Sequence, residues 1–258
     1  MDLHDRVKKL ELQLELERLK HFALLDFVVA RLNAQVADHC ARESSVSPIE
    51  LFRSTSDIDR TIVAFGGNAM KLGLPAAEFS KHLTSRGLAV VFIKDFYQAW
   101  YQRGLIGMSS DITSTIDVVC KLNQEWRSDR FIGTSAGGYA AILFGCKSAA
   151  KEIIAFAPQT VLNHDNVKIF SSQDTRLQEV LKINNKDFLD LLPIVESHQQ
   201  STVHIHYGCR NVSDKAAAER LGHLSNVRLY PMDFDGHNIA KFLRDQGKLD
   251  KALGPVLQ

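Results

Sequence analysis

From residue 61 onward, short apolar runs alternate with helical segments, and this alternation constrains the fold more than any other feature of the chain. The predicted strands span 61–65, 88–93, 130–133, 152–156, 203–207 and 227–232. The predicted helices lie near 75–86, 110–125, 136–147, 214–222 and 237–246. Repeated strand-helix units are typical of parallel sheets, and continuous apolar runs indicate strands covered on both faces. We therefore expect an α/β domain over 61–258, with a mostly parallel sheet of about six strands flanked by helices.

The first 42 residues form a separate pattern. They contain no Gly or Pro and place apolar residues at spacings of three and four, which predicts a long amphipathic helix. Its apolar stripe must cover either its own domain or a second copy of the chain, and we expect a homo-oligomer formed through this helix. Residues 43–60 are polar and are interpreted as a linker, with one short helical turn after Pro48.

More than forty residues separate the predicted strands at 152–156 and 203–207. Two helical pieces, 176–182 and 186–197, lie within this connection. Long insertions in compact α/β domains are often lids or binding elements, so an insertion at about 160–200 is expected to form a small helical lid. A peripheral helical decoration is the alternative.

Composition limits the partners and the location. With 31 Lys and Arg against 30 Asp and Glu, the formal charge is +1, which argues against a nucleic-acid partner. The chain has no signal-peptide pattern and no apolar run of the roughly 18 residues that span a bilayer, so a soluble cytoplasmic protein is expected. The four cysteines are scattered, and His204 and His206 lack a third ligand nearby, so no metal site is predicted.

The string Gly133-Thr134-Ser135-Ala136-Gly137 matches the G-x-S-x-G nucleophile elbow. A predicted strand precedes it and a predicted helix follows, which is the setting that this turn requires. The amino terminus of the helix also places partial positive charge near the Ser135 oxygen. Ser135 is therefore the candidate nucleophile, and an ordinary Gly-rich turn is the alternative.

A serine hydroxyl needs a base to take its proton and a carboxylate to orient that base. His237 lies in Asp235-Gly236-His237-Asn238 after the last predicted strand, and it is the best-placed histidine. Asp214, after the penultimate strand, is the candidate acid, although it could instead cap the helix that follows. Asp233 and Asp235 are alternatives.

An acyl-transfer site also needs donors for the developing oxyanion. Phe65-Gly66-Gly67-Asn68 follows the first predicted strand, so its backbone amides could act together with the amide of Ala136. Gly67 is the first choice in this loop and Asn68 the second. An ordinary glycine turn is again the alternative.

Together, FGGN, GTSAGG, YGCRNVSD and DGHN resemble the α/β-hydrolase superfamily over about 61–246, in the order that the family requires. The resemblance implies Ser135 as nucleophile, Asp214 as acid and His237 as base, with Gly67 and Ala136 as oxyanion donors. Two departures stand out. Phe65 occupies a position where many members have His, and little room remains for the two leading antiparallel strands of the full fold.

The segment from Asp95 to Gly104 follows the second predicted strand and is rich in aromatic residues. It is similar to a segment of small bacterial hydrolase-like proteins associated with surface-polysaccharide synthesis. Aromatic faces beside hydrogen-bonding groups suit sugar or aromatic acyl recognition, so Trp100, Tyr101 and Thr134 are candidate substrate-binding residues. Packing of Trp100 and Tyr101 between the lid and the core is the alternative.

The sequence therefore predicts a serine hydrolase that cleaves a carboxylic ester or thioester, with a small acyl ester, thioester or acylated sugar as substrate. No cofactor is expected, because neither a Walker loop nor a dinucleotide fingerprint is present. Two alternatives remain at this point. One is an acyltransferase that acts on a carbohydrate hydroxyl with the same three residues, and the other is a non-catalytic hydrolase-like scaffold.

Overall fold

The computed structural model describes residues 47–53, 60–163, 175–183 and 186–257. The amphipathic helix predicted over 1–42 lies outside these residues, and so does the homo-oligomer expected from it. Part of the insertion predicted at about 160–200 is also outside them, namely 164–174 and 184–185.

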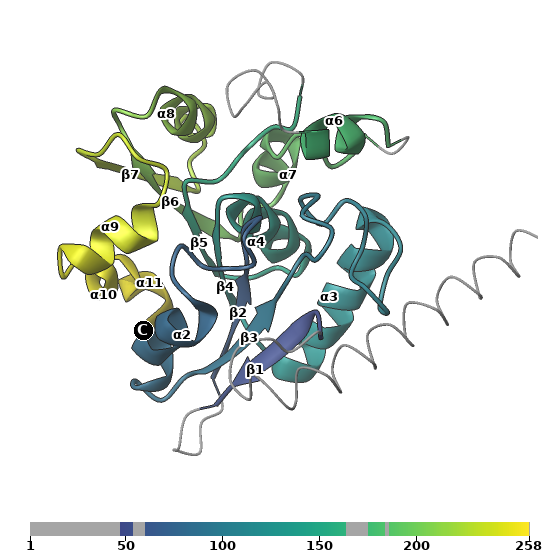
Figure 1. Cartoon of the computed structure of the whole chain (residues 1–258), viewed down its shortest axis with the longest axis horizontal. Helices are drawn as coiled ribbons and strands as arrows, with labels where there is room; N and C mark the ends of the chain where they lie inside the picture. Colours follow the sequence, from purple (N-terminus) through teal and green to yellow (C-terminus); the bar gives the residue numbers. More distant parts are fainter. Residues whose placement is uncertain (1–46, 54–59, 164–174, 184–185, 258) are drawn as a thin grey trace, which may run out of the picture. The chain divides into compact units, whose positions relative to one another are not determined.

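The centre of the fold is a seven-stranded sheet with strand order β1-β3-β2-β4-β5-β6-β7 (Figure 1). All neighbouring strands run parallel except β1 and β3, which are antiparallel. The strands are β1 (Ile49–Phe52), β2 (Thr61–Phe65), β3 (Ala89–Ile93), β4 (Arg130–Thr134), β5 (Glu152–Phe156), β6 (Thr202–Gly208) and β7 (Val227–Met232). The six predicted strands are confirmed to within one or two residues.

The additional strand β1 corrects the interpretation of residues 43–60. Ile49–Phe52 was expected to be part of a linker with a helical turn, but it pairs with β3 from Ile49 opposite Ile93 to Phe52 opposite Val90. An edge strand of four residues carries little sequence signal of its own, because its pairing depends on the exposed edge of β3. The sheet therefore includes one leading antiparallel strand.

Helices cover both faces of the sheet. They are α2 (Ala76–Thr84), α3 (Ile112–Trp126), α4 (Ala136–Lys147), α6 (Thr175–Leu181), α7 (Leu192–Ser197), α8 (Val212–Glu219), α9 (Ile239–Asp245), α10 (Leu249–Ala252) and α11 (Gly254–Leu257). One core contains side chains from α3, α4, α6, α7 and α8, and a second core contains side chains from α2, α9, α10 and α11. Alternate residues of a strand serve the two cores, as Phe65 and Ala64 of β2 do.

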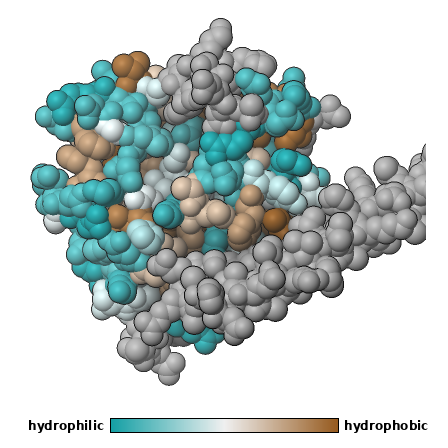
Figure 2. Space-filling model, in the orientation of Figure 1, coloured by the Kyte–Doolittle hydropathy of each residue, from teal (hydrophilic) through white to brown (hydrophobic). Residues whose placement is uncertain are grey.

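The distribution of polar and apolar residues agrees with this layering. Strands β2 to β5 are buried over four of their five residues, because helices cover both of their faces. On the face shown in Figure 2, the described surface is largely hydrophilic with smaller hydrophobic areas between. Within the described ranges, no helix combines the length and the apolar character needed to cross a membrane.

The two helices of the predicted lid pack on the first core. Leu177 and Val180 of α6 and Ile194 and Val195 of α7 are all buried. Arg176 of α6 also donates a hydrogen bond to the Gln98 side chain, 2.6 Å away. Helix α6 thus contacts the aromatic segment after β3, and a lid role for the two helices stays a prediction.

Candidate active site

Ser135 lies at the tight turn between β4 and α4. Its backbone has φ 54° and ψ −121°, a strained conformation that L-residues rarely adopt. The turn needs both glycines of the motif, because a Cβ on Gly133 would lie 1.9 Å from the Gly137 oxygen. A Cβ on Gly137 would lie 2.1 Å from the Phe65 oxygen. The strand-turn-helix context predicted for Ser135 is confirmed.

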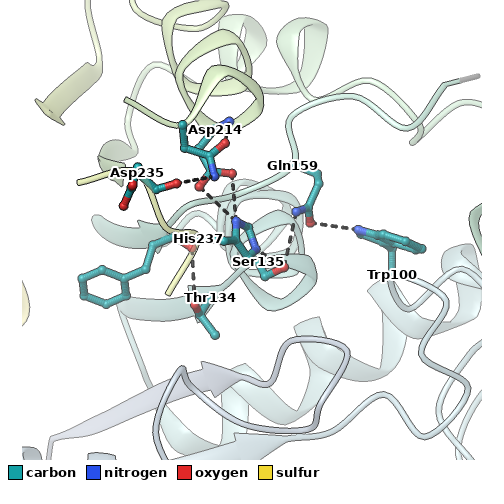
Figure 3. A network of polar contacts seen from close by, with 9 residues as sticks. Trp100, Thr134, Ser135, Gln159, Asp214, Asp235 and His237 are labelled. Carbon is teal, nitrogen blue, oxygen red and sulfur yellow. Dashed lines mark hydrogen bonds and ion pairs between the residues drawn. The ribbon is translucent and has the colours of Figure 1, made fainter. Parts of the chain in front are cut away.

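Three side chains that are far apart in the sequence meet at this turn (Figure 3). The Ser135 Oγ lies 2.8 Å from His237 Nε2. On the other side of the ring, His237 Nδ1 lies 2.8 Å from Asp214 Oδ1 and 3.0 Å from Oδ2. Ser135 follows β4, Asp214 lies in α8 after β6, and His237 follows β7, so the carboxyl ends of parallel strands bring the three together.

Asp214 is not the helix cap that sequence reasoning left open. Asn211 caps α8, and its side chain accepts a hydrogen bond from the Asp214 N–H. The Asp214 side chain is only 1% exposed, so its carboxylate is held on the imidazole and away from water. Of the two alternatives, Asp233 forms an exposed ion pair with Arg210, while the Asp235 carbonyl accepts a hydrogen bond from the Asn211 side chain.

Gln159 is a member of this cluster that sequence reasoning missed. It follows β5 and is 3% exposed. Its Nε2 lies 3.3 Å from the Ser135 Oγ, and its Oε1 lies 3.0 Å from the indole nitrogen of Trp100 (Figure 3). Its position in the chain was the available signal. A polar residue shortly after β5, the strand next to β4, is expected to lie near the turn that follows β4.

The donors and acceptors determine the direction of every hydrogen bond in the cluster. A carboxylate only accepts, so His237 carries its proton on Nδ1 toward Asp214 and presents Nε2 as an acceptor. An indole N–H only donates, so Gln159 turns its oxygen to Trp100 and its NH₂ group to Ser135. Ser135 Oγ therefore accepts from Gln159 and donates its own hydrogen to His237. Asp214 at one end of this chain of hydrogen bonds and Trp100 at the other therefore favour the same arrangement, in which the Ser135 hydrogen points at His237 Nε2.

Two backbone amides beside Ser135 are available to an oxyanion. Among the described residues, no hydrogen-bond acceptor is found for the N–H of Ala136 or of Asn68. The Gly67 N–H, by contrast, donates to the Lys71 carbonyl at 2.9 Å. The loop is close to Ser135, because a Cβ on Gly67 would lie 3.4 Å from Ser135 Cβ. This arrangement favours Asn68 over Gly67, the reverse of the order predicted from sequence.

Asp95 holds the aromatic segment after β3 in place. Its carboxylate accepts hydrogen bonds from the backbone N–H groups of Tyr97, Ala99 and Tyr101 at 2.7 to 3.0 Å. Burial raises the pKa of Asp95, although these backbone hydrogen bonds act to lower it. The hydrogen bonds to the Asp95 carboxylate support a strained turn in which Trp100 has φ 52° and Tyr101 has φ 62°. The backbone of this turn therefore fixes the position of the Trp100 indole.

Tyr101 does not occupy the place expected of a substrate contact. It is fully buried, and its hydroxyl lies 2.9 Å from the Gly66 carbonyl oxygen and 3.0 Å from that of Ile93, which share its single hydrogen as acceptors. Its ring packs edge-on against Phe65, the residue that stands where many hydrolases have His. The aromatic residue at position 65 thus completes this core together with Tyr101. Through its contact with the Gly66 carbonyl, Tyr101 supports the loop before Asn68. Its buried side chain leaves no surface for a ligand.

Trp100 and Thr134 are also enclosed. Trp100 is 3% exposed and contacts Gln159, and the buried Thr134 hydroxyl lies 3.4 Å from the Phe156 carbonyl. Both side chains therefore support the turn at Ser135. Of the described residues, no three His, Cys, Asp or Glu side chains converge where they could hold a metal ion.

Comparison with solved structures identifies the architecture. An α/β-hydrolase enzyme from the metagenome of lagoon sediments at Mar Chica, Morocco, superposes with a TM-score of 0.53 at 14% sequence identity, over 81% of this chain and 97% of that one. The chain has the α/β-hydrolase fold.

Two further structures with this fold differ in how much of them the chain covers. The esterase domain of a Rhodothermus marinus protein matches with a TM-score of 0.53 and 14% identity, over 81% of this chain and 89% of that one. The 2,6-dihydroxy-pseudo-oxynicotine hydrolase matches with a TM-score of 0.56 and 18% identity, over 79% of this chain. The chain spans only 62% of the length of that hydrolase. No protein-family model and no curated protein sequence matches the chain.

Proposed function

We propose that this protein is a serine hydrolase that cleaves a carboxylic ester or thioester through an acyl-enzyme intermediate. The observation that carries the proposal is the continuous chain of hydrogen bonds from Asp214 through His237 to Ser135, on a strained turn at the carboxyl ends of parallel strands. Esterases and other hydrolases among the structures with this fold support the same class of reaction. The proposed substrate is a small acyl ester or thioester.

In the first half-reaction, His237 Nε2 takes the Ser135 proton as Oγ bonds to the acyl carbon. The carbonyl oxygen becomes an oxyanion that accepts hydrogen bonds from the amides of Ala136 and Asn68, beside the positive end of α4. When the intermediate collapses, the bond to the leaving oxygen or sulfur breaks, and His237 returns the proton to the leaving group. The acyl group is then esterified to Ser135.

In the second half-reaction, His237 removes a proton from water, whose oxygen attacks the acyl carbon. The second tetrahedral intermediate breaks its bond to Oγ, the proton returns to Ser135, and the carboxylic acid leaves. Asp214 keeps the imidazole in the required tautomer throughout and stabilises its cationic form.

Gln159 is proposed to position the nucleophile. By donating to Oγ, it directs the Ser135 hydrogen at His237, and Trp100 holds the amide in that orientation. Replacing either residue by Gln159→Leu or Trp100→Phe should lower kcat about tenfold with little change in KM, the loss expected for one buried hydrogen bond. Steady-state kinetics on aryl esters measures this.

The pair should also act as a unit. The double variant Gln159→Leu/Trp100→Phe is expected to be no slower than the worse single variant, since both changes break the same contact. Trp126→Phe, at the end of α3, is the matched control and should retain wild-type kinetics. Additive losses in kcat, or a loss confined to KM, would contradict a positioning role.

The proposed reaction is tested with panels of aryl esters and thioesters of graded acyl length. We expect a burst of the leaving group followed by slower steady turnover, with the carboxylic acid as product. Repeating the assay with added sugars distinguishes hydrolysis from transfer. An acylated sugar as the main product would show that the protein is an acyltransferase and not a hydrolase. No turnover on any panel member would argue for a non-catalytic scaffold.

A further inference from the structure

A pocket of about 330 Å³ lies between strands β6 and β7 and the three carboxyl-terminal helices α9, α10 and α11. Figure 1 shows these helices in yellow. The side chains that line it include His206, Tyr230, Met232, Leu243, Lys248 and Lys251. None of the proposed catalytic residues lines the pocket. It belongs to the face of the sheet that packs on α2 and α9, whereas α4 packs on the other face.

His206 is a buried polar group without a partner in this pocket. It is 3% exposed, and among the described residues neither of its ring nitrogens has a hydrogen-bond partner. Burial, with a smaller effect from nearby His204, lowers the pKa of His206 to about 3, so the ring is neutral at physiological pH. A neutral imidazole has one donor and one acceptor to satisfy, and leaving both unpaired is costly.

The neighbouring His204 has partners for both of its ring nitrogens, unlike His206. His204 lies on the same face of β6, and its two nitrogens contact the Tyr230 hydroxyl at 3.0 Å and the Glu152 carboxylate at 2.7 Å. Aromatic rings flank His206 from the strands on either side, Tyr230 at 4.5 Å and Phe156 at 5.2 Å between ring centroids. The ring faces are thus covered by aromatic rings, and His206 is among the residues that line the pocket.

The charged residues that line the pocket are both cationic. Lys248 and Lys251 are exposed, and no carboxylate is among the lining residues. Within the described ranges, neither lysine forms an ion pair. Met232 and Leu243 supply apolar surface to the same lining. The lining therefore combines a cationic rim, an apolar wall and a hydrogen-bonding group at the sheet.

We infer that this pocket binds a small organic carboxylate with an apolar body and a hydroxyl group. The carboxylate would lie against Lys248 and Lys251, the apolar body against Met232 and Leu243, and the hydroxyl against His206. A hydroxyl fits the imidazole because it can accept from the protonated ring nitrogen or donate to the unprotonated one, whichever of the two it meets. The pocket volume is within the lower range of small-molecule sites.

The experiment is an NMR titration of the full-length protein, labelled at the methionine methyl groups, with p-coumarate as the probe. Met232 reports on the pocket, and exposed Met108 serves as an internal control. Cinnamate, which lacks the hydroxyl, and the neutral amide of p-coumarate test the two polar contacts separately. The variant Lys248→Gln/Lys251→Gln removes the cations, and Lys81→Gln/Lys121→Gln removes two exposed lysines elsewhere as the matched control.

We expect p-coumarate to shift the Met232 signal saturably and the Met108 signal little. Affinity should fall at least about tenfold in Lys248→Gln/Lys251→Gln and for the neutral amide, and severalfold for cinnamate, while the matched control binds as the wild type does. Three results would overturn the inference: no saturable shift of Met232, equal affinity in the pocket variant and the wild type, or equal affinity for all three probes. All lysines involved are exposed, so folding of the variants is not at stake.

Discussion

Replacing Ser135 by alanine is expected to reduce aryl ester hydrolysis at least about a thousandfold. Removing the nucleophile of a serine hydrolase leaves only the binding and oxyanion contributions, and known losses reach about a millionfold in kcat. Alanine retains the Cβ and adds no atom at the strained turn, so the thermal unfolding midpoint should change little. Steady-state kinetics and a thermal melt of the same preparation measure both effects.

Ser148→Ala is the matched control for this prediction, because Ser148 is the residue that follows the other end of α4. It should retain wild-type turnover. If Ser135→Ala hydrolysed aryl esters at a rate close to that of the wild type while remaining folded, Ser135 would not be the nucleophile. The hydrogen-bonded chain to Asp214 would then need another explanation.

The second large effect is expected from Gly137→Ala, which acts on the fold. The new Cβ would lie 2.1 Å from the Phe65 oxygen and 2.7 Å from the Gly66 carbonyl carbon, and both are backbone atoms that cannot rotate away. Either β2 and α4 move apart or the turn at Ser135 rearranges, so we expect a loss of unfolding free energy of about 4 kcal/mol or more. Urea denaturation followed by circular dichroism measures it.

Gly254→Ala provides the comparison within the same chain. Nothing lies within 4 Å of a Cβ at Gly254, and its φ is outside the region that favours glycine. The change should therefore alter the unfolding free energy by less than about 1 kcal/mol. Similar stabilities for Gly137→Ala and Gly254→Ala would show that the close approach of β2 to α4 is not a requirement of the fold.

Sequence reasoning succeeded for the residues whose place follows from chain order. Ser135 and His237 each lie in the loop or turn that follows a predicted strand, and Asp214 follows the next-to-last one, so a parallel sheet brings all three to the same edge. The strands themselves were recognisable because continuous apolar runs are what burial on both faces requires. Local patterns were sufficient in these cases.

Other features depend on contacts that no local pattern encodes. Gln159 is one polar residue in a loop until its amide meets Trp100, 59 positions away in the chain. The preference for Asn68 over Gly67 rests on one backbone hydrogen bond to Lys71. Tyr101 lies in an aromatic segment that resembled a binding surface, yet its hydroxyl is satisfied by two buried carbonyls. Tertiary structure decides each of these assignments.

The most direct test of the proposed nucleophile is covalent labelling with a fluorophosphonate, followed by mass spectrometry of the digested protein. The phosphonate should bond to Ser135 Oγ with loss of fluoride, giving one adduct per chain. Ser135→Ala should give none, and His237→Ala should react far more slowly because no base takes the serine proton. A folded wild-type protein with no adduct on Ser135, or with labelling unchanged in His237→Ala, would contradict the proposal.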